Sequence, residues 1–402
     1  MQLLFLCTTE FQIVTAFNIK MNMYPHDAAD IIIDNYHGQE SEIAERIKKT
    51  QVFRRVCYVK SEIENRTLHK YFRDKTEGKK EIGFLSAAHN SLVYVSTKIK
   101  QKLHGDVAYL RVVINGFNEL ALNQYNVFLS YGSKNSTTAL VPLLHKINPA
   151  CMIAEMDEGT GAYCNPHLAR GRVSLNTAYL YEPELCYDRT IKCIRIPKLS
   201  SQDQPLVKNL NSVFAYDGPK NKVYTDKAVF FDQGVASSMP KYLQNMPRAL
   251  RWLFSNTYHR HLEEEKLFKK EIELTYAILH RVKDKEPWIK LHPRTSEDVC
   301  QVILSDKNMV HVVPNRGIPW ELVLLNNHFE NNVFITYYSS AVCMMNACMS
   351  GESESNNEKI ICFHLRGYDM DDYVGTLVDN VAHSYSNVAV PRSWKELDQL
   401  LA

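Results

Sequence analysis

Short apolar runs alternate with segments of helical periodicity through the first half of the chain. Leu3–Cys7 predicts a buried strand, and Ile13, Phe17 and Met21 then recur at the spacing of one helix face. This alternation predicts a domain of parallel strands joined by helices. The further strands predicted in this half are Ile31–Ile33, Val52–Val59, Val127–Ser130 and Cys151–Met156.

The alternation fades at about residues 196–226 and then resumes. Pro197, Pro205 and the turn Asp217-Gly218-Pro219 predict a linker there. We therefore expect an α/β protein with domains at 1–195 and 227–402 and a ligand cleft between them. Strands are predicted at Ala228–Phe231, Trp288–Leu291, Val310–Val313, Val333–Thr336 and Ile360–Phe363, and helices at Lys241–His261, Glu264–Val282 and Ser296–Leu304.

Length and composition agree with two soluble domains. The chain has 402 residues, of which 45% are hydrophobic and 23% charged, which excludes disorder and collagen-like repeats. A net charge of +2 gives no basic field for nucleic acid. No apolar stretch approaches the ~18–20 residues of a membrane span. Ten cysteines without a C-x-x-C pair favour a reducing, cytoplasmic setting.

Three short motifs fall at predicted strand ends: Asp157-Glu158-Gly159, His292-Pro293 and Ser339-Ser340. Taken singly, each has an ordinary structural interpretation, namely a solvated turn, a turn and a helix cap. Together their chemistry is complementary. A carboxylate can take a proton from an attacking hydroxyl, a histidine can assist a phosphate leaving group, and serine hydroxyls can hold that phosphate. The set indicates group transfer from a nucleotide donor.

In the order and content of these motifs the chain resembles the bacterial sialyltransferases of lipooligosaccharide and capsule, which have the GT-B architecture of two facing Rossmann-like domains. Asp157-Glu158-Gly159 is similar to the acidic-acidic-glycine motif of that family, His292-Pro293 to its His-Pro motif, and Ser339-Ser340 to its Ser-Ser/Thr motif. The resemblance also covers Lys290, the opening Thr8-Thr9, and Pro319-Trp320-Glu321.

The resemblance implies an inverting, metal-independent sialyltransferase that needs no cofactor. It would move sialic acid from CMP-sialic acid to a terminal galactose-type residue of a surface glycan. Glu158 would be the general base and His292 would act on the leaving phosphate. Related enzymes often carry aspartate as the base, so Asp157 stays an alternative. On the donor side the implied residues are Lys290, Pro293, Pro319, Glu321, Ser339 and Ser340, and on the acceptor side Thr8 and Thr9.

Other features have simpler interpretations. Asp369-Met370-Asp371 has a metal-binding D-x-D spacing but lies in an acidic stretch typical of a solvated turn. His259 and His261 on one helix would face different directions and form no metal pair. The basic amphipathic stretch Lys241–His261 favours a core-facing helix over a peripheral membrane contact, although a lipid-linked acceptor on the inner membrane would suit such a contact.

Two other functions stay open. The first is another GT-B glycosyltransferase of lipooligosaccharide synthesis, such as a glucosyltransferase. The second is a non-catalytic protein that binds a glycan or a nucleotide, although such a protein has no use for a general base. A homodimer is also an open alternative to a monomer.

Overall fold

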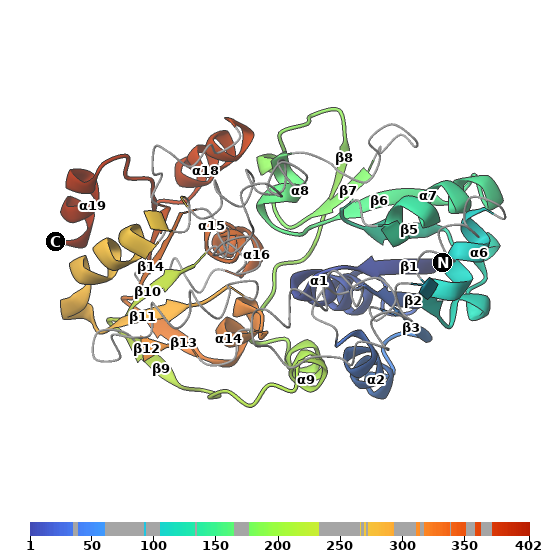
Figure 1. Cartoon of the computed structure of the whole chain (residues 1–402). Helices are drawn as coiled ribbons and strands as arrows, with labels where there is room; N and C mark the ends of the chain where they lie inside the picture. The colour runs from blue at the N-terminus through green and yellow to red at the C-terminus, as the bar shows by residue number, and fades with distance from the viewer. Residues whose placement is uncertain are drawn as a thin grey trace, which may run out of the picture.

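The computed structural model describes residues 1–34, 39–60, 92–93, 105–132, 135–164, 177–232, 266, 269–270, 272–292, 311–313, 317–337, 339–350, 358–362 and 372–402. These residues form two lobes, one from each half of the chain (Figure 1). The carboxyl terminus lies at the outer end of the second lobe, and α1, α8, α15 and α16 lie toward the middle of the molecule.

The first lobe contains an eight-stranded sheet in the order β4-β3-β2-β1-β5-β6-β7-β8. All neighbours are parallel except the β3–β4 pair. The order reverses direction between β1 and β5, which creates a switch point at their carboxyl ends. The strands are β1 Gln2–Cys7, β2 Ala28–Ile33, β3 Arg55–Val59, β4 Ile114–Asn115, β5 Val127–Ser130, β6 Met152–Met156, β7 Thr177–Leu180 and β8 Lys192–Arg195.

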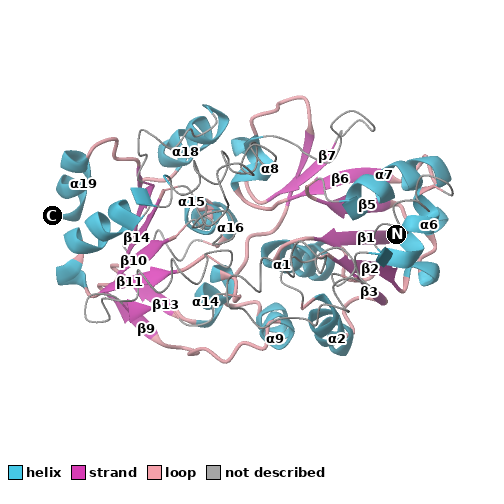
Figure 2. Ribbon diagram, viewed as in Figure 1, coloured by secondary structure: helices cyan, strands magenta, loops and turns pink. Residues whose placement is uncertain are grey.

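Both faces of this sheet are buried, as a parallel sheet requires. Leu3 and Phe5 of β1 belong to one apolar cluster, and Leu4 and Leu6 belong to another on the opposite face. Helices cover both faces (Figure 2). They are α1 Glu10–Asn18, which a π-helical turn continues over Ile19–Met23, and α2 Glu40–Thr50, α6 Asp106–Val113, α7 Asn135–Ile147 and α8 Thr160–Cys164.

The second lobe repeats the plan with a six-stranded parallel sheet in the order β12-β11-β10-β14-β15-β16. Its switch point lies between β10 and β14. The strands are β10 Ala228–Phe231, β11 Pro287–Lys290, β12 His311–Val312, β14 Val333–Thr336, β15 Lys359–Cys362 and β16 Val388–Ala389, and a separate pair is formed by β9 Val223–Thr225 and β13 His328–Glu330. The helices are a segment over 272–281, α14 Trp320–Asn326, α15 Ser340–Cys343, α16 Met345–Cys348, α18 Asp372–Ser384 and α19 Trp394–Leu401.

The predicted fold class is confirmed, because each half of the chain forms a doubly wound α/β sheet. The predicted strands at Val127–Ser130, Ala228–Phe231 and Val333–Thr336 have the predicted bounds, and several others differ by a few residues. Each of these three strands is buried along its whole length, and a short continuous run of β-branched and aromatic residues is the pattern that such a strand gives.

The segment at 196–226, predicted as a linker without periodicity, contains the helix α9 Gln204–Val213. Asp203 caps it by accepting the backbone N–H of Leu206, and Pro205 stands in the first turn, where proline removes no needed donor. Leu206 and Leu210 are fully buried. Because α9 lies between α2 and α14 (Figure 1), this segment packs against both lobes.

Several predictions fall outside the described residues. These are the helices Lys241–His261 and Ser296–Leu304, the Asp369-Met370-Asp371 motif, and Pro293. In the part of the chain that the structure describes, no helix has the length and apolarity to cross a bilayer. The nine cysteines in that part form no disulfide bonds.

Candidate active site

A cavity of about 190 Å³ lies between the two lobes, where the carboxyl ends of strands from both sheets meet. It brings together nearly all the side chains that the motifs indicated. Asp157 does not line it, and Pro293 lies outside the described residues. The predicted residues in the lining are Thr8, Thr9, Glu158, Lys290, His292, Pro319, Glu321, Ser339 and Ser340.

The acidic loop after β6 separates its two carboxylates. Asp157 is 1% exposed, and its oxygens accept the backbone N–H of Gly159 at 2.8 Å, the backbone N–H of Tyr181 at 3.1 Å and the hydroxyl of Tyr163. Burial raises the pKa of Asp157 to about 6, and these three hydrogen bonds oppose that rise. Asp157 therefore anchors the loop, whereas Glu158 is half-buried and lines the cavity.

Gly159 allows the two walls of the cavity to approach each other closely. Its φ of +96° lies in the left-handed region, where a side chain is strained. A Cβ at this position would lie 2.4 Å from Cβ and 2.8 Å from Oγ of Ser340 in the other lobe. The glycine therefore places the Glu158 loop directly against the Ser339-Ser340 turn.

Tyr131, which follows β5, is a neighbour of Glu158 that no sequence motif indicated. A Cβ added at Gly161 would lie 2.3 Å from Oη of Tyr131 and 3.7 Å from Oε2 of Glu158, so both atoms border the same small space. Burial, and next the charge of Glu158, raise the pKa of the Tyr131 hydroxyl. Tyr131 is thus a protonated phenol beside the candidate base.

Thr8 and Thr9 form the turn between β1 and α1 on the same side of the cavity. The side chain of Thr9 caps α1 by accepting the backbone N–H of Gln12 at 3.3 Å. The side-chain oxygen of Gln12 accepts the backbone N–H of Thr8 at 2.7 Å. These bonds fix the end of β1, where both threonines line the cavity on the side of the first lobe.

The opposite wall begins at the ends of β10 and β11. Lys290 ends β11 and is 7% exposed, and His292 follows two residues later at intermediate burial. Asp232, the residue after β10, accepts the backbone N–H of His292 at 3.4 Å and also lines the cavity. Sequence reasoning missed Asp232, although a polar residue directly after a buried strand is the same signal that identified Asp157.

Glu321 stands in the first turn of α14 and is 5% exposed. Burial raises the pKa of its carboxyl to about 7, and the positive charge of Lys290 opposes the rise. A buried lysine and a buried carboxyl group that keeps its proton to higher pH than usual therefore lie on the same wall. Such a pair suits a ligand that carries both a phosphate and neutral hydroxyls.

Ser339 and Ser340 complete this wall between β14 and α15. Ser339 occupies the N-cap position, but its side chain makes no capping hydrogen bond, which differs from the ordinary structural interpretation of the pair. The backbone N–H of Ser339 donates a hydrogen bond to Oγ1 of Thr336 at 2.9 Å. Both serines line the cavity beside Lys290 and His292.

The whole arrangement places two half-buried carboxyl side chains of the first lobe, Glu10 and Glu158, across the cavity from a wall with a lysine, a histidine and two hydroxyls. It can hold a phosphorylated donor on one side and deprotonate a hydroxyl on the other. Among the described residues, no group of three histidine, cysteine, aspartate or glutamate side chains is arranged to bind a metal.

No protein-family description matches this chain, and no curated protein matches it in sequence. Solved structures similar to it include the calicheamicin glycosyltransferase CalG4 (TM-score 0.42, 10% identity, 100% of this chain and 90% of that one). A sialyltransferase from Photobacterium damsela has a TM-score of 0.42 at 9% identity, over 97% and 81% of the two chains. A UDP-N-acetylglucosamine 2-epimerase has a TM-score of 0.39 at 10% identity, over 100% and 86%. These likenesses are distant and assign neither a family nor a reaction.

Proposed function

We propose that the protein is a GT-B-type glycosyltransferase, and that it transfers sialic acid with inversion from CMP-sialic acid to a terminal galactose-type residue of a surface glycan. One observation carries the proposal. Glu158 on one wall of a single cavity lies opposite His292, Ser339 and Ser340 on the other. The nature of the sugar and of its nucleotide follows from the family resemblance of the motifs.

In the proposed reaction an acceptor hydroxyl attacks the anomeric carbon of the donor from the Glu158 side. Its proton passes to Glu158 as the new glycosidic bond forms. The bond from the anomeric carbon to the phosphate oxygen breaks, and its electron pair stays on the phosphate. His292 stabilises or protonates that oxygen, and the two serine hydroxyls with Lys290 hold the phosphate. The transition state has oxocarbenium character.

The test begins with nucleotide selectivity. We expect CMP to raise the melting temperature and UDP, GDP and ADP to leave it unchanged at equal concentration, because only a ligand that prefers the folded state stabilises it. CMP-sialic acid and a lactose-type acceptor should then give a sialylated product. Selective stabilisation by UDP would indicate transfer of another sugar, and no response to any nucleotide would favour a non-catalytic glycan-binding protein.

The proposed transfer needs no metal ion, because a monophosphate leaving group needs less charge neutralisation than a diphosphate, and Lys290 and His292 lie at its proposed site. Product formation should therefore continue unchanged in excess EDTA. Loss of product with EDTA, and its return with magnesium or manganese, would contradict this expectation and direct attention to Asp369 and Asp371.

A further inference from the structure

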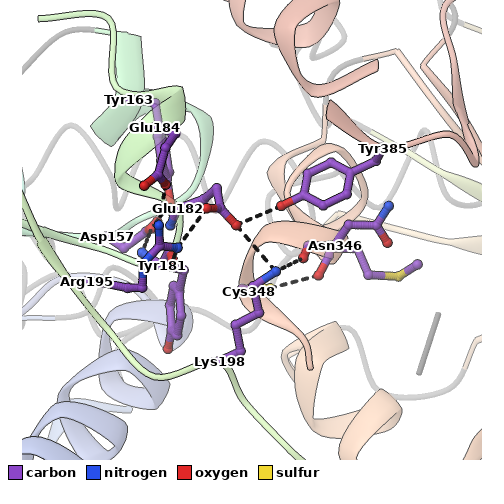
Figure 3. Close-up of polar contacts among 11 residues, drawn as sticks. Asp157, Tyr163, Tyr181, Glu182, Glu184, Arg195, Lys198, Asn346, Cys348 and Tyr385 are labelled. Atoms are coloured by element: carbon purple, nitrogen blue, oxygen red, sulfur yellow. Dashed lines mark hydrogen bonds and ion pairs between the residues drawn. The ribbon is translucent and has the colours of Figure 1, made fainter. Parts of the chain in front are cut away.

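A polar cluster connects the two lobes beside the cavity (Figure 3). Its centre is Glu182, which follows β7 and has a side chain that is 15% exposed. Within the first lobe, Oε1 of Glu182 accepts a hydrogen bond from Nη1 of Arg195 at 2.7 Å. The other guanidinium nitrogen of Arg195 pairs with Glu184, a residue whose side chain is 66% exposed.

The second oxygen of Glu182 faces the other lobe. Oε2 accepts the hydroxyl of Tyr385, which follows α18, at 2.9 Å. Nζ of Lys198 lies 3.3 Å from the same oxygen and donates to the backbone oxygen of Asn346 in α16 at 2.8 Å. Burial raises the pKa of Glu182, but hydrogen bonds from Arg195 and other partners outweigh it and lower the pKa to about 2. The carboxylate is therefore charged at neutral pH.

The backbone of the same residue reaches the acidic loop. The N–H of Glu182 donates to Oη of Tyr163 at 3.2 Å, and the Tyr163 hydroxyl donates to Asp157. Asp157 in turn holds the backbone of Gly159, so a continuous hydrogen-bonded path joins Glu182 to the loop that carries Glu158.

A backbone contact lies next to this cluster. The N–H of Leu199 donates to the oxygen of Cys348, and the N–H of Ser350 donates to the oxygen of Leu199, each at 2.8 Å. Cys348 and Met344 line the cavity on the wall that carries Ser339 and Ser340. The cluster is thus attached to both walls, at the acidic loop on one side and at α16 on the other.

We propose that Glu182 is a positioning residue that ties the two walls of the cavity together through Tyr385 and Lys198 and so sets the distance between Glu158 and the phosphate-binding serines. The inference rests on the proposed function, because that distance matters only when the two walls act on one reaction. A nucleotide that contacts only the second lobe should bind equally well when the contacts of Glu182 are lost. Transfer, in contrast, needs the two walls at the correct distance from each other.

The variants Tyr385→Phe and Glu182→Gln test this inference, since each removes a contact and keeps the side-chain shape. We expect each to lower kcat by about 10-fold, the lower end of the range for a hydrogen bond to a charged group, with unchanged CMP affinity. Amide exchange at Leu199 and Ser350 should become faster, because these amides report local opening between the lobes. Glu184→Gln is the matched control, since Glu184 binds the same arginine but has a side chain that is 66% exposed.

The outcomes separate this inference from the proposed function. Unchanged kcat in both variants, or unchanged exchange at Leu199 and Ser350, would overturn it, as would an equal effect of Glu184→Gln. If the unmodified protein transfers no sugar, the proposed function fails and the role of Glu182 in transfer fails with it. Faster amide exchange in the two variants would then still establish Glu182 as a tie between the lobes.

Discussion

The two walls of the cavity are held in place by different means. In the first lobe, the loop that carries Glu158 is fixed by neutral donors, which satisfy the buried carboxylate of Asp157. In the second lobe, Lys290 and Glu321 are themselves buried ionisable groups whose charges interact. The first wall is therefore organised by its own hydrogen bonds, whereas we expect the second wall to gain a charge partner from the phosphate of the proposed donor. Changes in the first wall should mainly alter the rate of transfer, and changes in the second should mainly alter nucleotide affinity.

The sharpest test of this difference is Glu158→Gln, which keeps the shape of the side chain and removes the base. We expect kcat to fall by about 10²–10⁴, the contribution of a general base, with nucleotide affinity unchanged. The measurement is kcat together with CMP titration.

Asp157→Asn serves as its partner variant. An amide group would face the donors that now bind Asp157, so its main effect should be a loss of folding stability of about 1–3 kcal/mol for each donor left unsatisfied. If Asp157→Asn is stable but inactive, and Glu158→Gln is active, then Asp157 is the general base and Glu158 is not.

His292→Ala should be the exception on the second wall. If the imidazole acts on the leaving oxygen, its removal should lower kcat by about 10² or more and change CMP affinity much less. Pre-steady-state transfer kinetics with titration calorimetry separates the two effects. Near-normal turnover in this variant would remove His292 from the mechanism.

The double variant Ser339→Ala with Ser340→Ala should show the opposite pattern. Each hydroxyl that binds a charged phosphate contributes about 1.5–3 kcal/mol, so CMP affinity should fall by at least about 10-fold. Ser384→Ala is a suitable control, because its hydroxyl bonds only to the backbone of its own helix. Unchanged CMP affinity in the double variant would leave these serines with a purely structural role.

Some of the residues in these predictions could be identified from the sequence, and others could not. Glu158, His292 and Ser339 could be predicted because each follows a buried parallel strand by two or three residues, and such strand ends gather at one edge of a sheet. Asp232 shares that signal, but no family motif supported it. Tyr131, Tyr163 and Glu182 could not be predicted, because their contacts depend on how loops distant in the chain pack together. The helix α9 was missed because Pro205 in its first turn, and the prolines and turn residues on either side of it, obscured a short amphipathic pattern.

The smallest expected effect concerns the pH dependence of stability on the second wall. The pKa of Glu321 is raised by burial to about 7, above the value of about 4.3 for an unfolded chain. The folded protein therefore holds this proton more tightly, and stability falls as pH rises from about 4.3 to about 7, then stays level. Glu321→Gln lacks this loss. Its melting temperature relative to the unmodified protein should rise by on the order of a few degrees across that interval. Glu184→Gln, an exposed change on the first lobe, should show no such trend. A difference that stays constant with pH would mean that Glu321 has the same pKa in the folded and the unfolded protein, and that its place in the second wall does not favour the protonated form.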